Sequence, residues 1–126
     1  MPLGHEFSND PLNKFENSFL HFNVGDEFMD ELYHYVVLGF QPGSFHWALF
    51  ANDMVSACLR SHPANSWQHI QETGKWLCHE APAECWGSYD KVKAWLALSD
   101  DDRREICTEK GLIATAWDIL KSPEVA

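Results

Sequence analysis

Apolar residues recur at spacings of three and four along most of this chain, and glycines and prolines separate the runs. That spacing places apolar side chains on one face of an α-helix, whereas strand residues alternate at a spacing of two. The sequence has no long alternating segment rich in β-branched residues, no internal repeat and no low-complexity tract. The pattern therefore predicts an all-α fold, an irregular bundle of about five or six helices.

Capping residues and breaks divide this bundle into segments. Asp26 and Ser44 are expected to cap helices over residues 27–38 and 44–61. The second of these is apolar on nearly every side, apart from Asn52-Asp53 at its middle, so we expect a buried central helix. Further caps are expected at Asn65 or Ser66, at Ser88 and at Ser99, before helices over residues 67–80, 89–98 and 100–110, and Gly111 precedes a short last helix over residues 112–120.

Residues 1–25 form a partly irregular N-terminal arm, and residues 26–126 are expected to form one helical domain. Asn, Pro, Gly and Ser punctuate the arm, yet it also carries large apolar side chains: Phe7, Phe15, Phe19, Leu20 and Phe22. A fully solvated tail does not need such residues. We therefore expect part of the arm to dock on the domain, with a short helix around residues 11–20.

The charge balance limits the partners of the chain. Its 126 residues include 19 acidic and 9 basic ones, and residues 1–57 alone hold eight acidic residues against Lys14. Such a surface repels phosphate backbones, so a partner protein with a basic surface is favoured over direct binding to nucleic acid. No apolar run approaches the roughly 20 residues that span a bilayer, and the start resembles no signal peptide. We expect a soluble, cytoplasmic protein without membrane contact.

A family resemblance rests on motifs in the middle of the chain. They are Gly39-Phe40-Gln41-Pro42-Gly43-Ser44-Phe45, Asn52-Asp53, Trp76-Leu77, Ala81-Pro82 and Trp86-Gly87-Ser88, followed by Val92 and Trp95. With these, residues 35–95 resemble a family of short tailed-phage proteins, named after gene product forty-nine of one phage and gene sixty-six of another. The resemblance implies a phage-encoded protein in the cytoplasm of an infected bacterium. The family has no assigned activity and supplies no catalytic residues to carry over.

The shared motif residues are candidate binding residues. Phe40, Pro42 and Ser44 lie in a glycine-containing loop before a helix, where backbone N–H groups can cradle an anion. Capping and turn formation also explain this loop, which lacks the P-loop and dinucleotide signatures. Asn52 and Asp53 interrupt an apolar helix, where a buried carboxylate needs a hydrogen-bonding partner. Asp53 is therefore either a perturbed acid or, more often in proteins, a member of a structural network.

Two tryptophans and two acidic stripes are candidate interface features. Trp67 and Trp86 lie near predicted helix starts in polar surroundings, where an exposed indole is an interface anchor and a covered one closes the core. Asp26, Asp30 and Glu31 give an acidic stripe on the first helix of the domain, and residues 100–102 begin a second one. Compensation of the helix dipole explains the second stripe. The carboxylates of both stripes also resemble the phosphate backbone that a DNA-binding protein recognises.

The four cysteines are expected to be buried free thiols, with no cofactor. Cys58 and His62 are four residues apart, so together with Cys78 and Cys85 they form a candidate zinc site. The six residues between the last two cysteines exceed the usual zinc-knuckle spacing. Cys58, Cys78 or Cys107 with one of the seven histidines would form a catalytic pair, but no local sequence signature surrounds any of these cysteines.

These observations predict a non-enzymatic phage accessory protein that binds and modulates a host or phage protein during infection. An inhibitor of a nucleic-acid-handling or defence protein would fit this class. Two alternatives stay open: a small metal-dependent or hydrolytic enzyme that uses Asp53 or the Cys–His residues, and an oligomeric structural or virion-associated protein.

Overall fold

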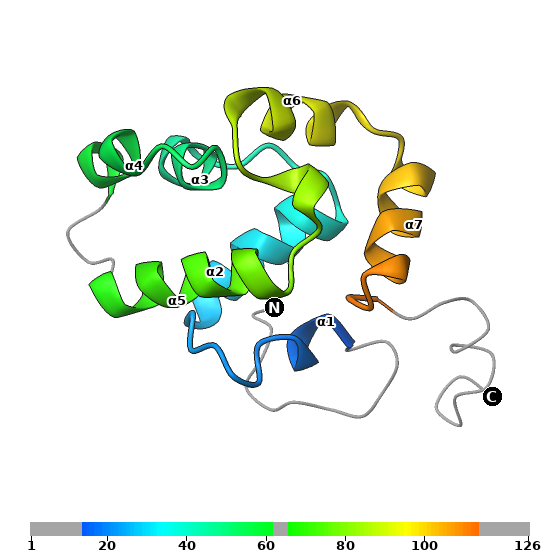
Figure 1. Cartoon of the computed structure of the whole chain (residues 1–126), viewed down its shortest axis with the longest axis horizontal. Coiled ribbons are helices and arrows are strands. Elements are labelled where there is room, and N and C mark those ends of the chain that lie inside the picture. Colours follow the sequence, from blue (N-terminus) through cyan, green and yellow to red (C-terminus); the bar gives the residue numbers. More distant parts are fainter. Residues whose placement is uncertain (1–13, 62–65, 114–126) are drawn as a thin grey trace.

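The computed structural model describes residues 14–61 and 66–113, which fold into helices joined by short loops, with no strand among them (Figure 1). In chain order they form α1 (Lys14–Asn17), α2 (Asp26–Leu32), the π-helix η2 (Tyr33–Val37), α3 (Ser44–Phe50), α4 (Met54–Arg60), α5 (Trp67–His79), the 3-10 helix η3 (Ala83–Cys85), α6 (Tyr89–Ala97) and α7 (Asp100–Glu109). The all-α prediction is confirmed. Most of the helix expected over residues 112–120 lies outside the described ranges. No helix within those ranges is long and apolar enough to cross a membrane.

The core is built around aromatic side chains from several helices. Tyr35, Phe50, Trp76 and Trp95 are almost completely buried. The rings of Tyr35 and Phe50 stack with centroids 4.5 Å apart, which joins η2 to α3. The hydroxyl of Tyr35 donates to the carbonyl oxygen of Cys85 at 2.6 Å, so this polar atom is satisfied inside the core.

Part of the N-terminal arm packs into the same core. Phe15 and Phe19 are buried, and the ring of Phe19 stacks on that of Trp76 at a centroid distance of 4.8 Å. The indole N–H of Trp76 donates to Ser18 Oγ at 2.9 Å. This part of the arm thus docks on the helical domain, as expected, and the contact is with α5. The short helix of the arm spans only Lys14–Asn17 within the described residues.

Three of the predicted caps are confirmed and two are wrong. Ser66, Ser88 and Ser99 each accept a hydrogen bond from the backbone N–H three residues later. Asp26 and Ser44 are instead the first residues of their helices, so the N-cap positions of α2 and α3 fall on Gly25 and Gly43. The residues before them are glycines, which have no side chain to offer.

The single helix expected over residues 44–61 is also wrong, because the chain breaks at Asn52 and Asp53. Asn52 adopts a left-handed backbone with φ of 62°, a conformation that asparagine tolerates better than most residues. Asp53 then caps α4 by accepting the N–H of Ser56 at 3.1 Å. The break turns α4 away from the path of α3, and α4 lies at the edge of the molecule rather than in its centre (Figure 1).

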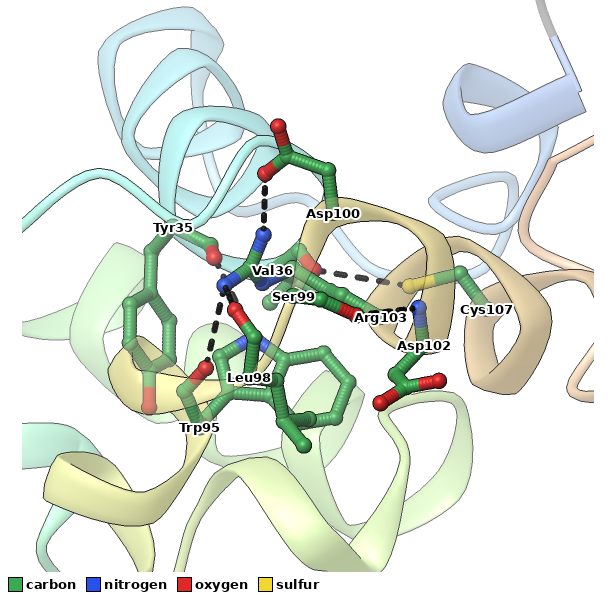
Figure 2. A network of polar contacts seen from close by, with 9 residues as sticks. All are labelled: Tyr35, Val36, Trp95, Leu98, Ser99, Asp100, Asp102, Arg103 and Cys107. Carbon is green, nitrogen blue, oxygen red and sulfur yellow. Dashed lines mark hydrogen bonds and ion pairs between the residues drawn. The ribbon is translucent and has the colours of Figure 1, made fainter.

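A buried arginine connects the C-terminal part of the fold, as Figure 2 shows. Arg103 of α7 is only 2% exposed. Its Nη2 donates to the carbonyl oxygens of Trp95 at 3.2 Å and of Leu98 at 2.8 Å, and its Nη1 pairs with Asp100 at 2.9 Å. The guanidinium therefore satisfies the carbonyls at the end of α6 and holds α7 against it.

The π-helix η2 supplies backbone acceptors to the same region (Figure 2). The wider winding of a π-helix changes which carbonyls are paired within the helix. The carbonyl of Tyr35 accepts the indole N–H of Trp95 at 3.2 Å, and the carbonyl of Val36 accepts the thiol of Cys107 at 3.4 Å. Both contacts tie η2 to the helices that follow it.

Candidate functional site

The α4–α5 surface, which we define as Met54, Val55, Leu59 and Trp67, is the main apolar feature exposed on the described part of the chain. The exposed fractions of these side chains are 46%, 73%, 82% and 56%. Val55 and Leu59 are four residues apart and therefore share one face of α4. Large apolar side chains that lie together on a surface are typical of binding sites, whereas single ones are common everywhere.

The local sequence explains why α4 presents these residues to solvent. Ala57, a small side chain, is the buried contact of α4. Asp53 fixes the start of the helix through Ser56 and also accepts the hydroxyl of Tyr89 at 2.6 Å, which ties α4 to α6. The Tyr89 hydrogen bond, followed by the bonds from Ser56, lowers the pKa of Asp53. The carboxylate is thus part-exposed, ionised and structural, which corrects its expected place inside a buried helix.

A groove adjoins this surface. It has a volume of about 590 Å³, and Met54 and Trp67 line it together with the half-buried Trp86. Asn52 lines the same groove, so the structure brings together three of the sequence-predicted binding residues. The remaining lining residues come mostly from α5 and include Ile70, Leu77 and Cys78. The cavity is large enough for apolar side chains of a partner.

The loop before α3 lies elsewhere. Phe40 is 57% exposed, and its ring stacks on His34 with centroids 5.8 Å apart. Pro42 and Ser44 line a second cavity, of about 410 Å³, on α3, α4 and α6. No residue lines both cavities, so the shared motif is divided between two places on the described surface.

The acidic candidates are also separate from the α4–α5 surface. Asp26 is exposed on α2, whereas Asp30 and Glu31 are half-buried. The acidic residues at the start of α7 are exposed, and in Figure 1 this helix lies on the opposite side of the molecule from α4. Neither acidic stripe therefore forms part of the groove.

The candidate zinc ligands occupy contrasting environments. Cys58 and Cys78 are exposed, Cys85 is completely buried, and His62 lies outside the described residues. Burial raises the pKa of Cys85 far above that of a free thiol, and zinc binds the thiolate. Within residues 14–61 and 66–113, no three His, Cys, Asp or Glu side chains are grouped to hold a metal ion.

The candidate nucleophile Cys107 is a core residue. Burial raises the pKa of its thiol to about 12, and the thiol donates to the carbonyl of Val36. A nucleophilic cysteine needs the opposite shift, because the thiolate is the reactive form. The expectation of buried thiols is confirmed for Cys85 and Cys107 and is wrong for Cys58 and Cys78, which α4 and α5 present to solvent.

Sequence reasoning missed Met54, Val55 and Leu59, because a continuous helix would have buried all three. The signal for their exposure was the sequence Asn52-Asp53, followed by Ser56. Asparagine favours a helix C-terminus and aspartate an N-cap, so this pair inside an apolar run indicates two helices. The second helix then has too few core contacts to cover its apolar face.

No protein-family model, curated protein or solved structure matches the chain.

Proposed function

We propose that this chain is a non-enzymatic accessory protein that binds a partner protein through the α4–α5 surface and thereby modulates the partner's activity. The observation that carries the proposal is the exposure of Met54, Val55, Leu59 and Trp67. Two of these residues, Met54 and Trp67, also line the groove. Burying one such side chain contributes roughly 1.5–3 kcal/mol, so a few of them can support a specific complex.

The groove adds shape to this surface. Trp67 and Trp86 both line it, and tryptophan is enriched among the residues that dominate binding energy. An amphipathic helix of the partner would place apolar side chains between them, at the spacing of one helical turn. α4 would contribute Val55 and Leu59 to the same contact.

Charge favours a partner with a basic surface. The net charge of −10 would attract such a partner and accelerate its approach, while the apolar contact provides affinity. A host or phage protein that handles nucleic acid has such a surface. The resemblance of residues 35–95 to a phage family supports an encounter during infection.

The test compares two variants of the tagged full-length chain in a lysate of the infected host. Leu59→Asp places a charge on the α4–α5 surface, and Leu20→Asp makes the same change at a leucine that is 62% exposed near α1. Both positions are exposed, so both variants are expected to fold, which circular dichroism checks. We expect the wild-type chain and Leu20→Asp to retain one stoichiometric partner and Leu59→Asp to lose it.

The purified partner is then titrated calorimetrically against each variant. Leu59→Asp is expected to weaken binding at least tenfold, whereas Leu20→Asp has no effect. Equal binding of both variants would contradict the assignment of the surface. A dimer of the chain alone, detected by light scattering and abolished by Leu59→Asp, would instead favour the oligomeric alternative.

A further inference from the structure

The cavity of about 410 Å³ lies between α3, α4 and α6 and differs in chemistry from the groove. Arg60 of α4 and Lys93 of α6 both line it, and no acidic residue does. The chain has only nine lysines and arginines against 19 acidic residues, so two cations at one cavity stand out from the overall charge.

Both cations are on exposed side chains. Among the described residues, neither Arg60 nor Lys93 forms a hydrogen bond or a close ion pair, in contrast to Arg103 and Lys75. Arg60 acts electrostatically on Asp53, a carboxylate that already accepts hydrogen bonds from Ser56 and Tyr89. The two cations make the cavity positive, and Asp53 partly offsets Arg60, so a small anion of low charge suits this site.

The rest of the lining combines three apolar residues with the polar side chains of Gln41, Ser44 and Tyr89. Pro42 and Ala48 are buried, and the half-buried indole of Trp47 lies between them in sequence and lines the same cavity. The hydroxyl of Tyr89 donates its hydrogen bond to Asp53, so its single O–H is already used and does not serve an anion. The hydroxyl of Ser44 and the side-chain amide of Gln41 remain as neutral donors.

We propose that this cavity binds a small aromatic carboxylate, with the carboxylate between Arg60 and Lys93 and the ring against Trp47. A guanidinium binds a carboxylate through two parallel N–H groups, and an ammonium adds a second charge-assisted bond. The volume lies near the lower end of ligand sites, which suits a single ring with a short acid side chain. The site shares no residue with the groove and is independent of the proposed partner.

The test is calorimetric titration of the full chain with three probes of similar shape. Phenylacetate carries the carboxylate, phenylacetamide is its neutral counterpart, and phenyl phosphate offers a phosphate monoester. We expect phenylacetate to bind at least tenfold more tightly than phenylacetamide, and added salt to weaken its binding. No binding of phenylacetate up to its solubility limit would overturn the proposal. Tighter binding of phenyl phosphate would overturn the assignment to a carboxylate.

Substitutions at the two cations test whether the ligand binds in this cavity. Arg60→Gln and Lys93→Gln are each expected to weaken phenylacetate binding at least tenfold. Arg104→Gln and Lys110→Gln make the same charge changes at exposed residues of the α7 region that do not line the cavity, and should leave binding unchanged. If all four variants weaken binding equally, the attraction comes from the overall charge of the chain. That result would contradict a defined site.

Discussion

Replacing Gly39 with alanine should destabilise the protein far more than the same change at other glycines. Gly39 has φ of 72°, and a β-carbon at this position would overlap the guanidinium of Arg103. That guanidinium is buried and bonded to two carbonyls at the end of α6, so it has no free space to move into. Gly39 thus permits both the turn after η2 and the closure of α7 on α6.

The magnitude follows from two costs. An L-residue in the left-handed region costs roughly 1–2 kcal/mol. Displacement of Arg103 breaks two hydrogen bonds from a charged donor, each worth roughly 1.5–3 kcal/mol when buried. Gly39→Ala should therefore lower the free energy of unfolding by about 4 kcal/mol or more.

Substitutions at two other glycines separate the cost of the left-handed backbone from the cost of displacing Arg103. Gly111 has φ of 84° but no neighbour within 4 Å of an added β-carbon, so Gly111→Ala should cost only about 1 kcal/mol. Gly43 has an ordinary φ of −68° and open space, so Gly43→Ala should be neutral or slightly stabilising. Urea unfolding followed by tryptophan fluorescence measures all three variants.

The double variant tests the overlap directly. Arg103→Ala removes the guanidinium, so adding Gly39→Ala to it should cost about 3 kcal/mol less than adding it to the wild type. Simple additivity of the two changes, or a cost of Gly39→Ala no larger than that of Gly111→Ala, would refute the close packing of Gly39 against Arg103.

Three further predictions concern protons, thiols and the link between α4 and α6. Burial among phenylalanines lowers the pKa of His46 from 6.5 to about 4, so the unfolded chain takes up a proton that the folded one does not. The free energy of unfolding should therefore fall by about 3 kcal/mol as the pH drops from about 6.5 to about 4, and His46→Phe should flatten this slope. A thiol reagent should modify Cys58 and Cys78 quickly in the folded protein but Cys85 and Cys107 only after unfolding, and four equally fast thiols would contradict the fold. Tyr89→Phe should lower the melting temperature and raise the pKa of Asp53, measured by the carboxyl chemical shift, and an unchanged pKa would exclude their hydrogen bond.

Local physical rules were sufficient to predict the class of fold and many helix ends. The apolar period predicted helices, and the serines at 66, 88 and 99 predicted their starts, because a cap needs only neighbours within one turn. The phenylalanines of the arm predicted that it docks on the domain, but they did not predict that Trp76 is the residue they contact. That contact joins residues 57 positions apart, and no local pattern specifies it.

The features that define the candidate site depend on tertiary structure. The exposure of Leu59 follows from the break at Asn52. We predicted a continuous helix there because we gave the apolar run more weight than the two capping residues, Asn52 and Asp53. The convergence of Arg60 and Lys93 on one cavity requires α4 to approach α6, which the bond between Asp53 and Tyr89 fixes. Neither contact is visible as a spacing in the sequence.

Alkylation of the two exposed cysteines tests the central claim most directly. Cys58 lies on α4, and Cys78 lines the groove, so both are natural reporters of the α4–α5 surface. The free chain and its purified complex are treated with N-ethylmaleimide, and the modified peptides are followed by mass over time. The account predicts that both cysteines react in the free chain and are protected in the complex. Unchanged reaction rates in a stoichiometric complex would contradict binding through this surface.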